Sequence, residues 1–388
     1  MKLRDPELRL ENFGDMNLSP AVSSALEKMS IRLPTPVQTQ AIPTSMSGSD
    51  MIAIAPAGTG KTIAFALSIL KTFEQKPASR ALILVPSREV ATQIFSVFET
   101  LCSEDPIKAC LVIGGEKDNN QYSQLRKMPR IIVATPGRMN DLLRENKLLL
   151  QGVAVVVIDE ADRMLDLGFT GQLKQIQSTM RGERQTMLFS ATFNPNVQQL
   201  AEIFMREDVV MLRSEGGNAP ASTLSQTVFF LPGGKKNALL IEELKLMEGS
   251  VIVFTGSQES AEIVGEHLRQ NGQSVDLIHG ELSQGHRSRV VRDFRDAKFR
   301  VLVTTDLLAR GLDVPDVALV VNFDLPYKTE DFLHRIGRTA RAGRSGTAIT
   351  FITPEDRDTF KKIQPYVKGA REVSLDGPPS RPSKSKKY

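Results

Sequence analysis

The alternation of short, uninterrupted apolar runs with longer amphipathic stretches constrains this chain more than any other feature. In the first half, the apolar runs predict strands at 51–55, 81–85, 109–113, 130–134, 153–158 and 186–189. Helical periodicity lies between them, at 61–73, 89–101, 138–144 and 195–204. Strands without polar alternation are typical of parallel sheets that carry helices on both faces. The pattern therefore predicts a doubly wound α/β domain.

The same alternation begins again after residues 215–223, a small, polar segment that contains two glycines and a proline. Further strands are predicted at 250–255, 274–279, 300–304, 318–323 and 347–352. We therefore expect two doubly wound domains, residues 1–214 and 224–370, with residues 215–223 as the linker. Residues 371–388 are expected to form a basic disordered tail.

Composition excludes several classes of protein. Apolar residues make up 41% of the 388 residues and charged residues 24%, which is typical of globular proteins rather than fibrous or disordered ones. Two cysteines, Cys102 and Cys110, provide neither a disulfide framework nor a metal-ligand spacing. The net charge of +4 is matched by four basic residues among the last twelve, so residues 1–376 are formally neutral. We expect a soluble, cytoplasmic protein without a membrane span.

A phosphate-binding loop is predicted at Ala55–Thr62, which reads APAGTGKT between a predicted strand and a predicted helix. Glycines at 58 and 60 allow successive backbone N–H groups to point at phosphate oxygens. Lys61 would neutralise the β- and γ-phosphates, and the hydroxyl of Thr62 would bind Mg²⁺. The general pattern has glycine where Ala55 stands, so an ordinary strand–helix turn stays open as an alternative for this segment alone.

An acidic segment, Asp159-Glu160-Ala161-Asp162, follows the predicted strand at 153–158. In a parallel sheet this position lies at the same edge as the phosphate loop. Asp159 would hold Mg²⁺, partly through its water shell, and Glu160 would act as the general base toward the attacking water. By itself such a run could also be a solvated helix N-terminus, but its pairing with the phosphate loop favours a nucleotide triphosphatase.

With this tetrapeptide the chain resembles the DEAD-box ATP-dependent RNA helicases, which share a superfamily-two helicase core. The resemblance runs from about Phe13 to Thr353 and includes about a dozen motifs in the family's order. It implies two tandem RecA-like domains with the ATP site in the cleft between them. It also implies RNA-stimulated ATP hydrolysis that drives local, non-processive unwinding of short RNA duplexes.

Upstream, Pro34-Thr35-Pro36-Val37-Gln38 resembles the family's adenine-recognising segment, and Phe13 matches the aromatic residue that stacks on the base. The family usually has glycine where Ser30 stands. The resemblance implies that the nucleotide is bound by Phe13, Gln38, Ala55, Pro56, Ala57, Gly58, Thr59, Gly60, Lys61, Thr62, Gly311 and Asp313.

RNA contacts are implied in both domains. In the first they lie in three loops that follow predicted strands: Pro86, Ser87 and Arg88; Gly114 and Gly115; and Thr135, Pro136, Gly137 and Arg138. In the second they are Gly256, Arg287 and Thr304. Because phosphate contacts position a nucleic acid without reading its bases, we expect little sequence specificity.

Residues that couple the two ligands are implied as well. Ser190 and Thr192 of the Ser-Ala-Thr motif would bind the DEAD carboxylates, Asp162 among them, and His334 would bridge to the same segment. The segment at 334–341 resembles the family's arginine-finger motif, in which Arg338 and Arg341 would reach the γ-phosphate. The family often has glycine where Ala340 stands. The four arginines at 335, 338, 341 and 344 could also form a solvated face.

Three alternatives stay open or are excluded at this point. An ATP-gated RNA clamp would use the same residues with little unwinding, and the sequence does not separate it from a helicase. A DNA translocase of the same superfamily is disfavoured by Gln38 and the DEAD tetrapeptide. A dinucleotide-dependent oxidoreductase is excluded because no G-x-G-x-x-G opens the first helix. We expect a monomer that takes ATP, Mg²⁺ and RNA, with no membrane partner.

Overall fold

The computed structural model describes residues 1–6, 9–56, 58–104, 107–115, 118–180, 182–213, 223–306, 317–340, 345–367 and 370–374. The chain divides into two compact units, Met1–Gly217 and Asn218–Tyr388. The boundary between them falls inside the segment predicted as a linker. Gly311, Asp313, Arg341 and Ala57, all assigned to the ATP site by resemblance, lie outside the described residues.

The first unit is built on one parallel sheet of eight strands in the order β1-β8-β2-β7-β6-β3-β5-β4. The strands are β1 (Lys2–Arg4), β2 (Asp50–Ile54), β3 (Arg80–Leu84), β4 (Ala109–Val112), β5 (Ile131–Ala134), β6 (Val153–Ile158), β7 (Gln185–Ser190) and β8 (Asp208–Arg213). The helices are α1 (Pro20–Lys28), α2 (Pro36–Met46), α3 (Lys61–Gln75), α4 (Arg88–Leu101), α5 (Asp118–Arg126), α6 (Pro136–Glu145), α7 (Ala161–Asp166), α8 (Thr170–Thr179) and α9 (Pro195–Phe204), with 3-10 turns η1 (Phe13–Met16) and η2 (Lys147–Leu150).

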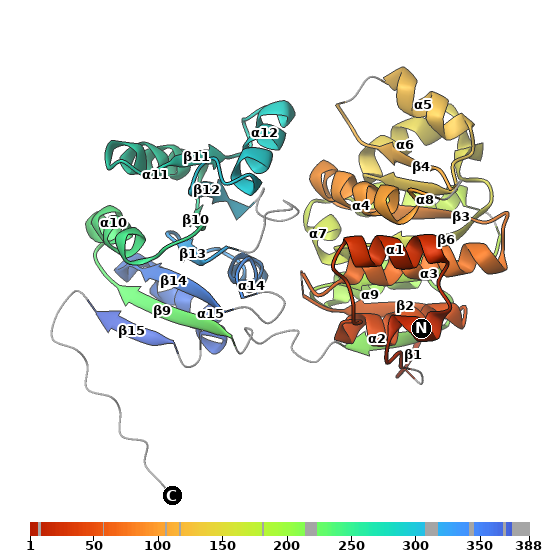
Figure 1. The fold of residues 1–388 in the computed structure, drawn as a ribbon, viewed down its shortest axis with the longest axis horizontal. Coiled ribbons are helices and arrows are strands. Elements are labelled where there is room, and N and C mark those ends of the chain that lie inside the picture. Colours follow the sequence, from red (N-terminus) through yellow and green to blue (C-terminus); the bar gives the residue numbers. More distant parts are fainter. Residues whose placement is uncertain are drawn as a thin grey trace, which may run out of the picture. The chain divides into compact units, whose positions relative to one another are not determined.

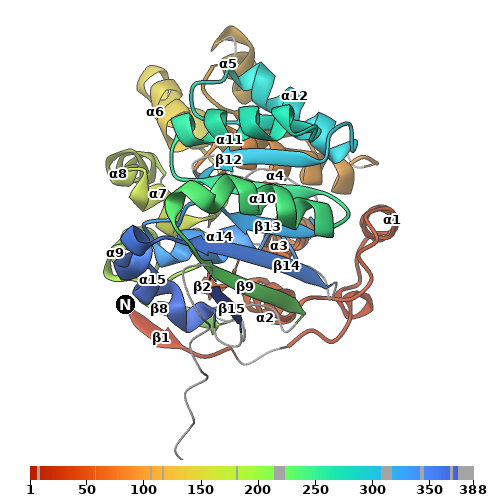
Figure 2. The same cartoon turned by 90° about the vertical axis from the view of Figure 1, so that its left-hand side faces the viewer.

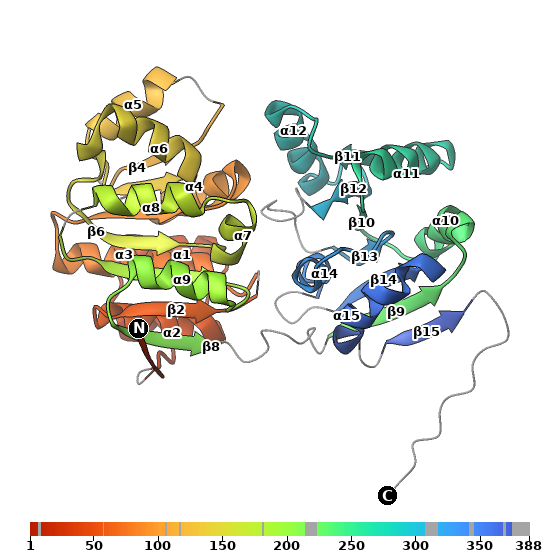
Figure 3. The ribbon, with the colours of Figure 1, turned by 180° about the vertical axis from the view of Figure 1, so that it is seen from behind.

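Helices cover both faces of this sheet because alternate residues of each buried strand point to opposite faces. Met51 and Ala53 of β2 pack in a core with α1 to α4, the helices in front of the sheet in Figure 1. Ile52 of the same strand packs in a second core with α5 to α9, and α8 and α9 cover that face in Figure 3. These two cores explain why the strands carry continuous apolar runs.

The second unit repeats the architecture with a parallel sheet of seven strands, in the order β11-β12-β10-β13-β14-β9-β15. The strands are β9 (Leu224–Phe230), β10 (Val251–Thr255), β11 (Val275–Ile278), β12 (Val301–Thr305), β13 (Leu319–Asn322), β14 (Gly346–Ile352) and β15 (Arg371–Ser374). The helices are α10 (Lys236–Leu246), α11 (Gln258–Gln270), α12 (Gln284–Arg295), α14 (Thr329–Ile336) and α15 (Arg357–Ile363), with 3-10 turns η3 (Gly233–Lys235), η4 (Pro354–Asp356) and η5 (Gln364–Tyr366). Helices α10 and α11 cover one face, in front of the strands in Figure 2. Helices α12, α14 and α15 pack on the other.

The predicted fold class, two doubly wound parallel-sheet domains, is confirmed. The prediction is wrong for residues 371–374, which were assigned to the tail: Arg371–Ser374 form β15 and pair in parallel with β9. Val373 packs against an apolar core of the unit, which accounts for the ordering of this short edge strand. Residues 375–388 lie outside the described part of the chain.

Candidate functional site

All the predicted site loops of the first unit lie at one edge of its sheet. Every strand pair in this sheet is parallel, so the loops that follow the strands share the carboxyl edge. The order of strands then arranges the loops. The phosphate loop follows β2, the Ser-Ala-Thr segment follows the adjacent β7, and Asp159-Glu160 follows β6, next along. The three loops implied to contact RNA follow β3, β5 and β4, and so continue the same edge beyond the nucleotide loops.

The phosphate loop has the backbone that its glycines were predicted to allow. Gly58 and Gly60 adopt left-handed φ angles of 76° and 90°, and Gly60 is the N-cap of α3. Lys61 is 8% exposed, and its Nζ donates to the carbonyl of Ala55 at 3.1 Å. The lysine amine therefore lies over the first residue of the loop, close to where a bound phosphate would need a positive charge.

Gln38 joins the upstream segment to this loop. Its Nε2 donates to the carbonyl of Gly60 at 2.9 Å, and its Oε1 accepts from the backbone N–H of Thr35 at 2.9 Å. The hydroxyl of Thr35 donates to the carbonyl of Thr59 at 2.7 Å. A Cβ at Gly60 would lie 2.4 Å from Gln38 Nε2, so only glycine fits beneath this amide. The amide thus supports the loop, and its recognition of adenine stays a prediction.

Phe13 and Ser30 belong to the same upstream region. Phe13 is only 8% exposed and packs in the apolar core with Leu10, so its ring faces protein in this structure. Stacking on a nucleotide base stays a prediction for it. Ser30 stands where the family usually has glycine, and its φ of 59° shows that the left-handed turn is kept despite the side chain.

Asp159 is the most strongly perturbed acid at this edge. It is 5% exposed, and burial raises its pKa to about 6, although the positive charge of Lys61 opposes the shift. A buried carboxylate whose charge is incompletely compensated favours the binding of a cation. Oxygen ligands such as this carboxylate and the Thr62 hydroxyl are those that Mg²⁺ prefers, so the donor set fits the predicted ion. Among the described residues no cluster of three or more His, Cys, Asp or Glu side chains is gathered for a metal.

Asp162 ties the acidic segment to the Ser-Ala-Thr segment. Its Oδ2 accepts from the N–H of Ala191 at 3.2 Å, the N–H of Thr192 at 3.0 Å and the hydroxyl of Thr192 at 3.1 Å. The predicted contact is thus present for Thr192. Ser190 differs, because its hydroxyl accepts from the backbone N–H of Asp162 at 3.4 Å instead of binding a carboxylate.

The loops implied to contact RNA meet one another. Arg88, at the start of α4, lies over Gly114 and Gly115, where a Cβ on Gly115 would approach its Nη1 to 2.4 Å. Arg138, in α6, donates through Nε to Gln121 Oε1 at 3.3 Å, and Gln121 donates to the carbonyl of Ile113 at 2.8 Å. The loops after β3, β5 and β4 are therefore joined by side chains.

The remaining residues of these loops have local roles as well. Ser87 caps α4 by accepting from the N–H of Val90, and Thr135 is the N-cap residue before Pro136, the first residue of α6. Gly137 has open space where a Cβ would lie. Pro86 is buried beside them. Their contact with RNA stays a prediction.

In the second unit the three residues implied to contact RNA differ in exposure: Gly256 is exposed, Arg287 is half-buried and Thr304 is buried. The N–H of Gly256 donates to Asp324 Oδ2 at 3.0 Å. Thr304 is 1% exposed, and its hydroxyl donates to the carbonyl of Thr305, so it faces protein. Arg287 donates through Nη2 to the carbonyl of Gly280 at 2.6 Å. Contact with RNA stays a prediction for all three.

Two arginines of the arginine-rich motif, Arg335 and Arg338, are buried rather than solvated, while Arg341 and Arg344 lie outside the described residues. Arg335 is 1% exposed and forms a bidentate ion pair with Asp306, in which Nε donates to Oδ1 at 2.5 Å and Nη2 donates to Oδ2 at 2.7 Å. Its guanidinium lies over the ring of Phe254. Arg338 is 6% exposed, and its carbonyl accepts from the N–H of Val317. His334 is half-buried on α14. The finger role of Arg338 and the bridging role of His334 stay predictions.

Four side-chain groupings were not predicted from the sequence: Arg163 with Glu160, Gln121 with Arg138, Arg335 with Asp306, and Lys236 with Asp324. Three of them pair a residue that the motifs name with one beside or far from it, whereas no motif names Lys236 or Asp324. The position of Asp306 directly after β12, and of Asp324 two residues after β13, was the available signal, since the same rule found Asp159.

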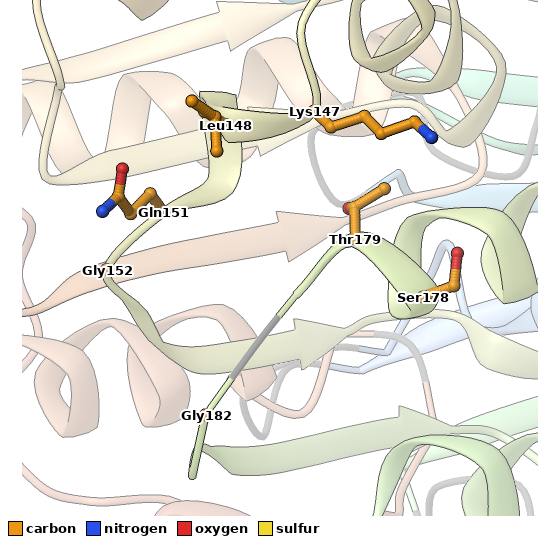
Figure 4. Close-up of a pocket in the computed structure, with 7 residues that line it drawn as sticks. All are labelled: Lys147, Leu148, Gln151, Gly152, Ser178, Thr179 and Gly182. Atoms are coloured by element: carbon orange, nitrogen blue, oxygen red, sulfur yellow. The ribbon is translucent and has the colours of Figure 1, made fainter.

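A hollow of about 610 Å³ lies elsewhere on the first unit. Its lining comes from η2, the end of α8 and the segments that precede β6 and β7, and Figure 4 shows these residues, among them Lys147, Gln151 and Thr179. It is at the amino edge of the sheet, opposite the phosphate loop, and none of the predicted site residues lines it. Among the described residues, no helix is long and apolar enough to cross a membrane.

Comparison with known proteins agrees with this geometry. The family model for DEAD/DEAH box helicases matches residues 35–200, and that for the helicase conserved C-terminal domain matches residues 235–343. The chain is 39% identical over 375 residues to the ATP-dependent rRNA helicase RRP3 of Pyricularia oryzae, which covers 96% of this chain and 70% of that protein. It is 38% identical to RRP3 of Encephalitozoon cuniculi over 91% of this chain and 88% of that protein.

A solved structure is similar over nearly the whole length. Dbp5 of S. cerevisiae, bound to RNA and ADP BeF3, superposes with a TM-score of 0.81 at 32% identity, covering 94% of this chain and 96% of that one. Together with the loops predicted to bind nucleotide and RNA, which share one sheet edge, these likenesses identify the chain as a member of the DEAD/DEAH box helicase family, an ATP-dependent RNA helicase.

Proposed function

We propose that the enzyme separates short RNA duplexes locally and without processive movement, using RNA-stimulated hydrolysis of ATP. The observation that carries this proposal is the order of loops along one edge of the first sheet. The nucleotide loops after β2, β7 and β6 adjoin the loops after β3, β5 and β4 that are implied to contact RNA. Asp162 joins the nucleotide loops after β6 and β7, and Arg88 joins the loops after β3 and β4 that are implied to contact RNA, so each set of loops is linked by direct contacts.

Glu160 is the proposed general base. It follows the buried Asp159, and its backbone N–H donates to Asp159 Oδ1 at 2.9 Å. Lys61 and the amides of the phosphate loop would hold the phosphates, while Thr62 and Asp159 would hold Mg²⁺. When bound, Mg²⁺ supplies charge neutralisation for the transferred phosphoryl group. Further positive charge would come from Arg338 and Arg341 of the second unit.

The substitution Glu160→Gln tests this assignment. Because a general base contributes about 10²–10⁴ in rate, RNA-stimulated hydrolysis should fall by at least about a hundredfold. Affinity for a fluorescent ATP analogue and for RNA should stay within about twofold, since the glutamine keeps the size and hydrogen-bonding capacity of the side chain. Hydrolysis at the wild-type rate would contradict the role of Glu160.

An unwinding assay separates the helicase from an ATP-gated clamp. The helicase should release the strand of a short duplex in an ATP-dependent way and lose that activity steeply as the duplex lengthens. A clamp would instead hold single-stranded RNA for minutes with ATP while leaving the duplex intact. Two duplexes of equal length and different sequence should be unwound at similar rates, because backbone contacts position RNA without reading its bases.

We also propose that the enzyme acts as a monomer in the cytoplasm, where ATP and RNA are both available to it. Sedimentation at working concentration should give the mass of one chain, and fractionation of cells should recover the protein with the cytoplasm. A dimer, or recovery in another compartment, would contradict this part of the proposal.

A further inference from the structure

The backbone of Glu160 is held in a conformation that a non-glycine residue rarely adopts. Its φ of 53° and ψ of 50° are left-handed, and it is the N-cap of α7. This conformation is unfavourable for an L-residue, and such strain persists where surrounding contacts determine it. Contacts around Glu160 are therefore expected to hold it in this conformation.

An ion pair from the next helical turn holds its side chain. Arg163 Nη1 lies 3.3 Å from Glu160 Oε2, and the two side chains are 7% and 17% exposed. Residues three apart on a helix lie on one face, so this contact spans the first turn of α7. Since both groups are largely removed from solvent, salt screens the pair less than it would an exposed one.

Arg163 also contacts the carboxylate that binds the Ser-Ala-Thr segment. Its backbone N–H donates to Asp162 Oδ1 at 3.0 Å, while Asp162 Oδ2 accepts from Ala191 and Thr192. The residue thus supports both Glu160, through its side chain, and Asp162, through its backbone. Substitution of the side chain leaves the backbone contact in place, so the two roles can be tested apart.

The charges around Glu160 indicate the role of the Arg163 guanidinium. Asp159, Glu160 and Asp162 place three carboxylates within four positions, and like charges in a poorly solvated site repel one another. Lys61 acts on Asp159, and Arg163 is the cation in contact with Glu160. Without Arg163, the Glu160 carboxylate would gain free energy by turning toward solvent and away from Asp159.

We propose that Arg163 is a positioning residue that holds the Glu160 carboxylate beside the nucleotide site for the hydrolysis step. This inference rests on the proposed role of Glu160 as general base. Arg163 touches neither ATP nor RNA in this account. Its loss should therefore slow turnover without weakening binding of either ligand.

The experiment compares two neutral variants, Arg163→Met and Arg163→Gln, with Arg163→Lys, which keeps a cation. The matched control is Arg144→Met on α6, because Arg144 Nη1 pairs with Asp141 Oδ1 at the same spacing and at 3.4 Å, but with exposed side chains. For each variant, kcat and KM for ATP are measured at saturating RNA, together with RNA-free hydrolysis, RNA affinity and the thermal unfolding midpoint.

The neutral variants should lower kcat between about tenfold and a hundredfold, the cost of misplacing a reacting group by about 1 Å. KM and RNA affinity should stay within about twofold, Arg163→Lys should recover most of kcat, and Arg144→Met should match wild type. In a Glu160→Gln background, Arg163→Met should cause no further loss, because interacting residues are not additive.

Any of three results would overturn the proposal. The first is a wild-type kcat in a neutral variant whose unfolding midpoint is unchanged. The second is an Arg163→Lys enzyme as slow as the neutral variants. The third is faster hydrolysis of ATP without RNA in a neutral variant, which would show that the ion pair inhibits the enzyme until RNA binds. Failure of the base assignment looks different, because Glu160→Gln would then hydrolyse ATP at the wild-type rate. If Glu160→Gln is inactive and folded Arg163→Met is not slowed, the positioning role alone fails.

Discussion

Two aspartates occupy corresponding places in the two units and have opposite electrostatics. Asp159 follows β6 of the first sheet, and Asp324 lies two residues after β13 of the second. Burial raises the pKa of Asp159 to about 6. Burial acts on Asp324 in the same direction, but the charge of Lys236 and hydrogen bonds from Lys236, Gly256 and Ser260 together lower its pKa.

The difference in pKa distinguishes Asp159, the acid predicted to bind a metal ion, from Asp324, an acid that stabilises its own unit. Lys236 Nζ lies 2.8 Å from Asp324 Oδ1, and the N–H of Gly256 and the hydroxyl of Ser260 donate to Oδ2. The second unit thus provides both the cation and the hydrogen-bond donors that Asp324 needs, and Asp324 in turn holds the loop after β10 through these hydrogen bonds. Burial makes ionisation of the Asp159 carboxyl unfavourable, and a bound cation would offset that free-energy cost. A carboxylate that binds a metal ion has this property.

The largest expected effect is on catalysis. Asp159→Asn should reduce RNA-stimulated ATP hydrolysis by at least about a hundredfold, because several kcal/mol of charge stabilisation depends on the cation. Steady-state phosphate release measures it. Asp141→Asn, which removes an exposed carboxylate from an ion pair on α6, serves as the control and should hydrolyse ATP normally. Turnover in Asp159→Asn close to that of the control would remove the contrast between the two aspartates.

The next effect is on stability in the second unit. Asp324→Asn removes the nearer of two anionic partners of Lys236, whose side chain is 11% exposed, and leaves only Asp356 Oδ2 at 4.0 Å. Breaking such a pair should cost about 2 kcal/mol, and denaturant unfolding of the second unit measures it. Asp358→Asn, which breaks an exposed ion pair with Lys361, should have a much smaller effect on the free energy of unfolding. Equal costs for the two variants would show that Asp324 is not structural.

The pH dependence of stability should have opposite signs at the two positions. In metal-free protein the folded state holds the Asp159 proton more tightly than the unfolded state, so its contribution to stability falls as pH rises from about 4 through 6. For Asp324 the folded pKa is lowered, so its contribution is present above about pH 4 and is lost on further acidification.

Unfolding free energies of wild type, Asp159→Asn and Asp324→Asn between pH 3 and 8, in chelator, measure these slopes. The Asp159→Asn protein should lack the decline between about pH 4 and 6, and Asp324→Asn should lack the loss below about pH 4. Parallel profiles for wild type and both variants would contradict the electrostatic difference between the sites.

The smallest effect concerns the two positions where glycine is usual in the family. Ser30 in the first unit and Ala340 in the second have φ angles of 59° and 58°, in the left-handed region. Ser30→Gly and Ala340→Gly should each stabilise the protein by about 0.5–1 kcal/mol, the strain relieved less the entropy that glycine adds to the unfolded chain. Ala297→Gly, at φ 55° outside both motifs, is the control and should give a similar gain. A loss of stability at either motif position would show that the side chain there makes compensating contacts.

The sequence predicted most strands because their apolar runs are continuous, and α9 has the predicted bounds. It missed β1 and β15, which are short edge strands of mixed polarity ordered by pairing with β8 and β9. It also missed β9, which is polar at 225–227. It missed β8 as well, whose short apolar run follows α9 after three residues and cannot be told from a continuing helix by periodicity alone.

The site was predictable to the level of its loops, because parallel strands bring successive loops to one edge. Side-chain partners were not, since they depend on packing between segments far apart in sequence. Gln121, which receives Arg138, and Asp306, which holds Arg335, are examples. The burial of Phe13 and Thr304 is another consequence of packing that a motif does not reveal.

The most direct test of this account is the thermal stabilisation of wild type, Asp159→Asn and Asp324→Asn by ATP with Mg²⁺. Binding to the folded state raises the unfolding midpoint in proportion to the ligand's free energy of binding. The account predicts that Asp159→Asn, more stable than wild type without ligand at pH 7, gains far less from ATP and Mg²⁺. Asp324→Asn, less stable without ligand, should gain as much as wild type. An undiminished gain in Asp159→Asn would contradict the claim that the edge of the first sheet holds the nucleotide through this carboxylate.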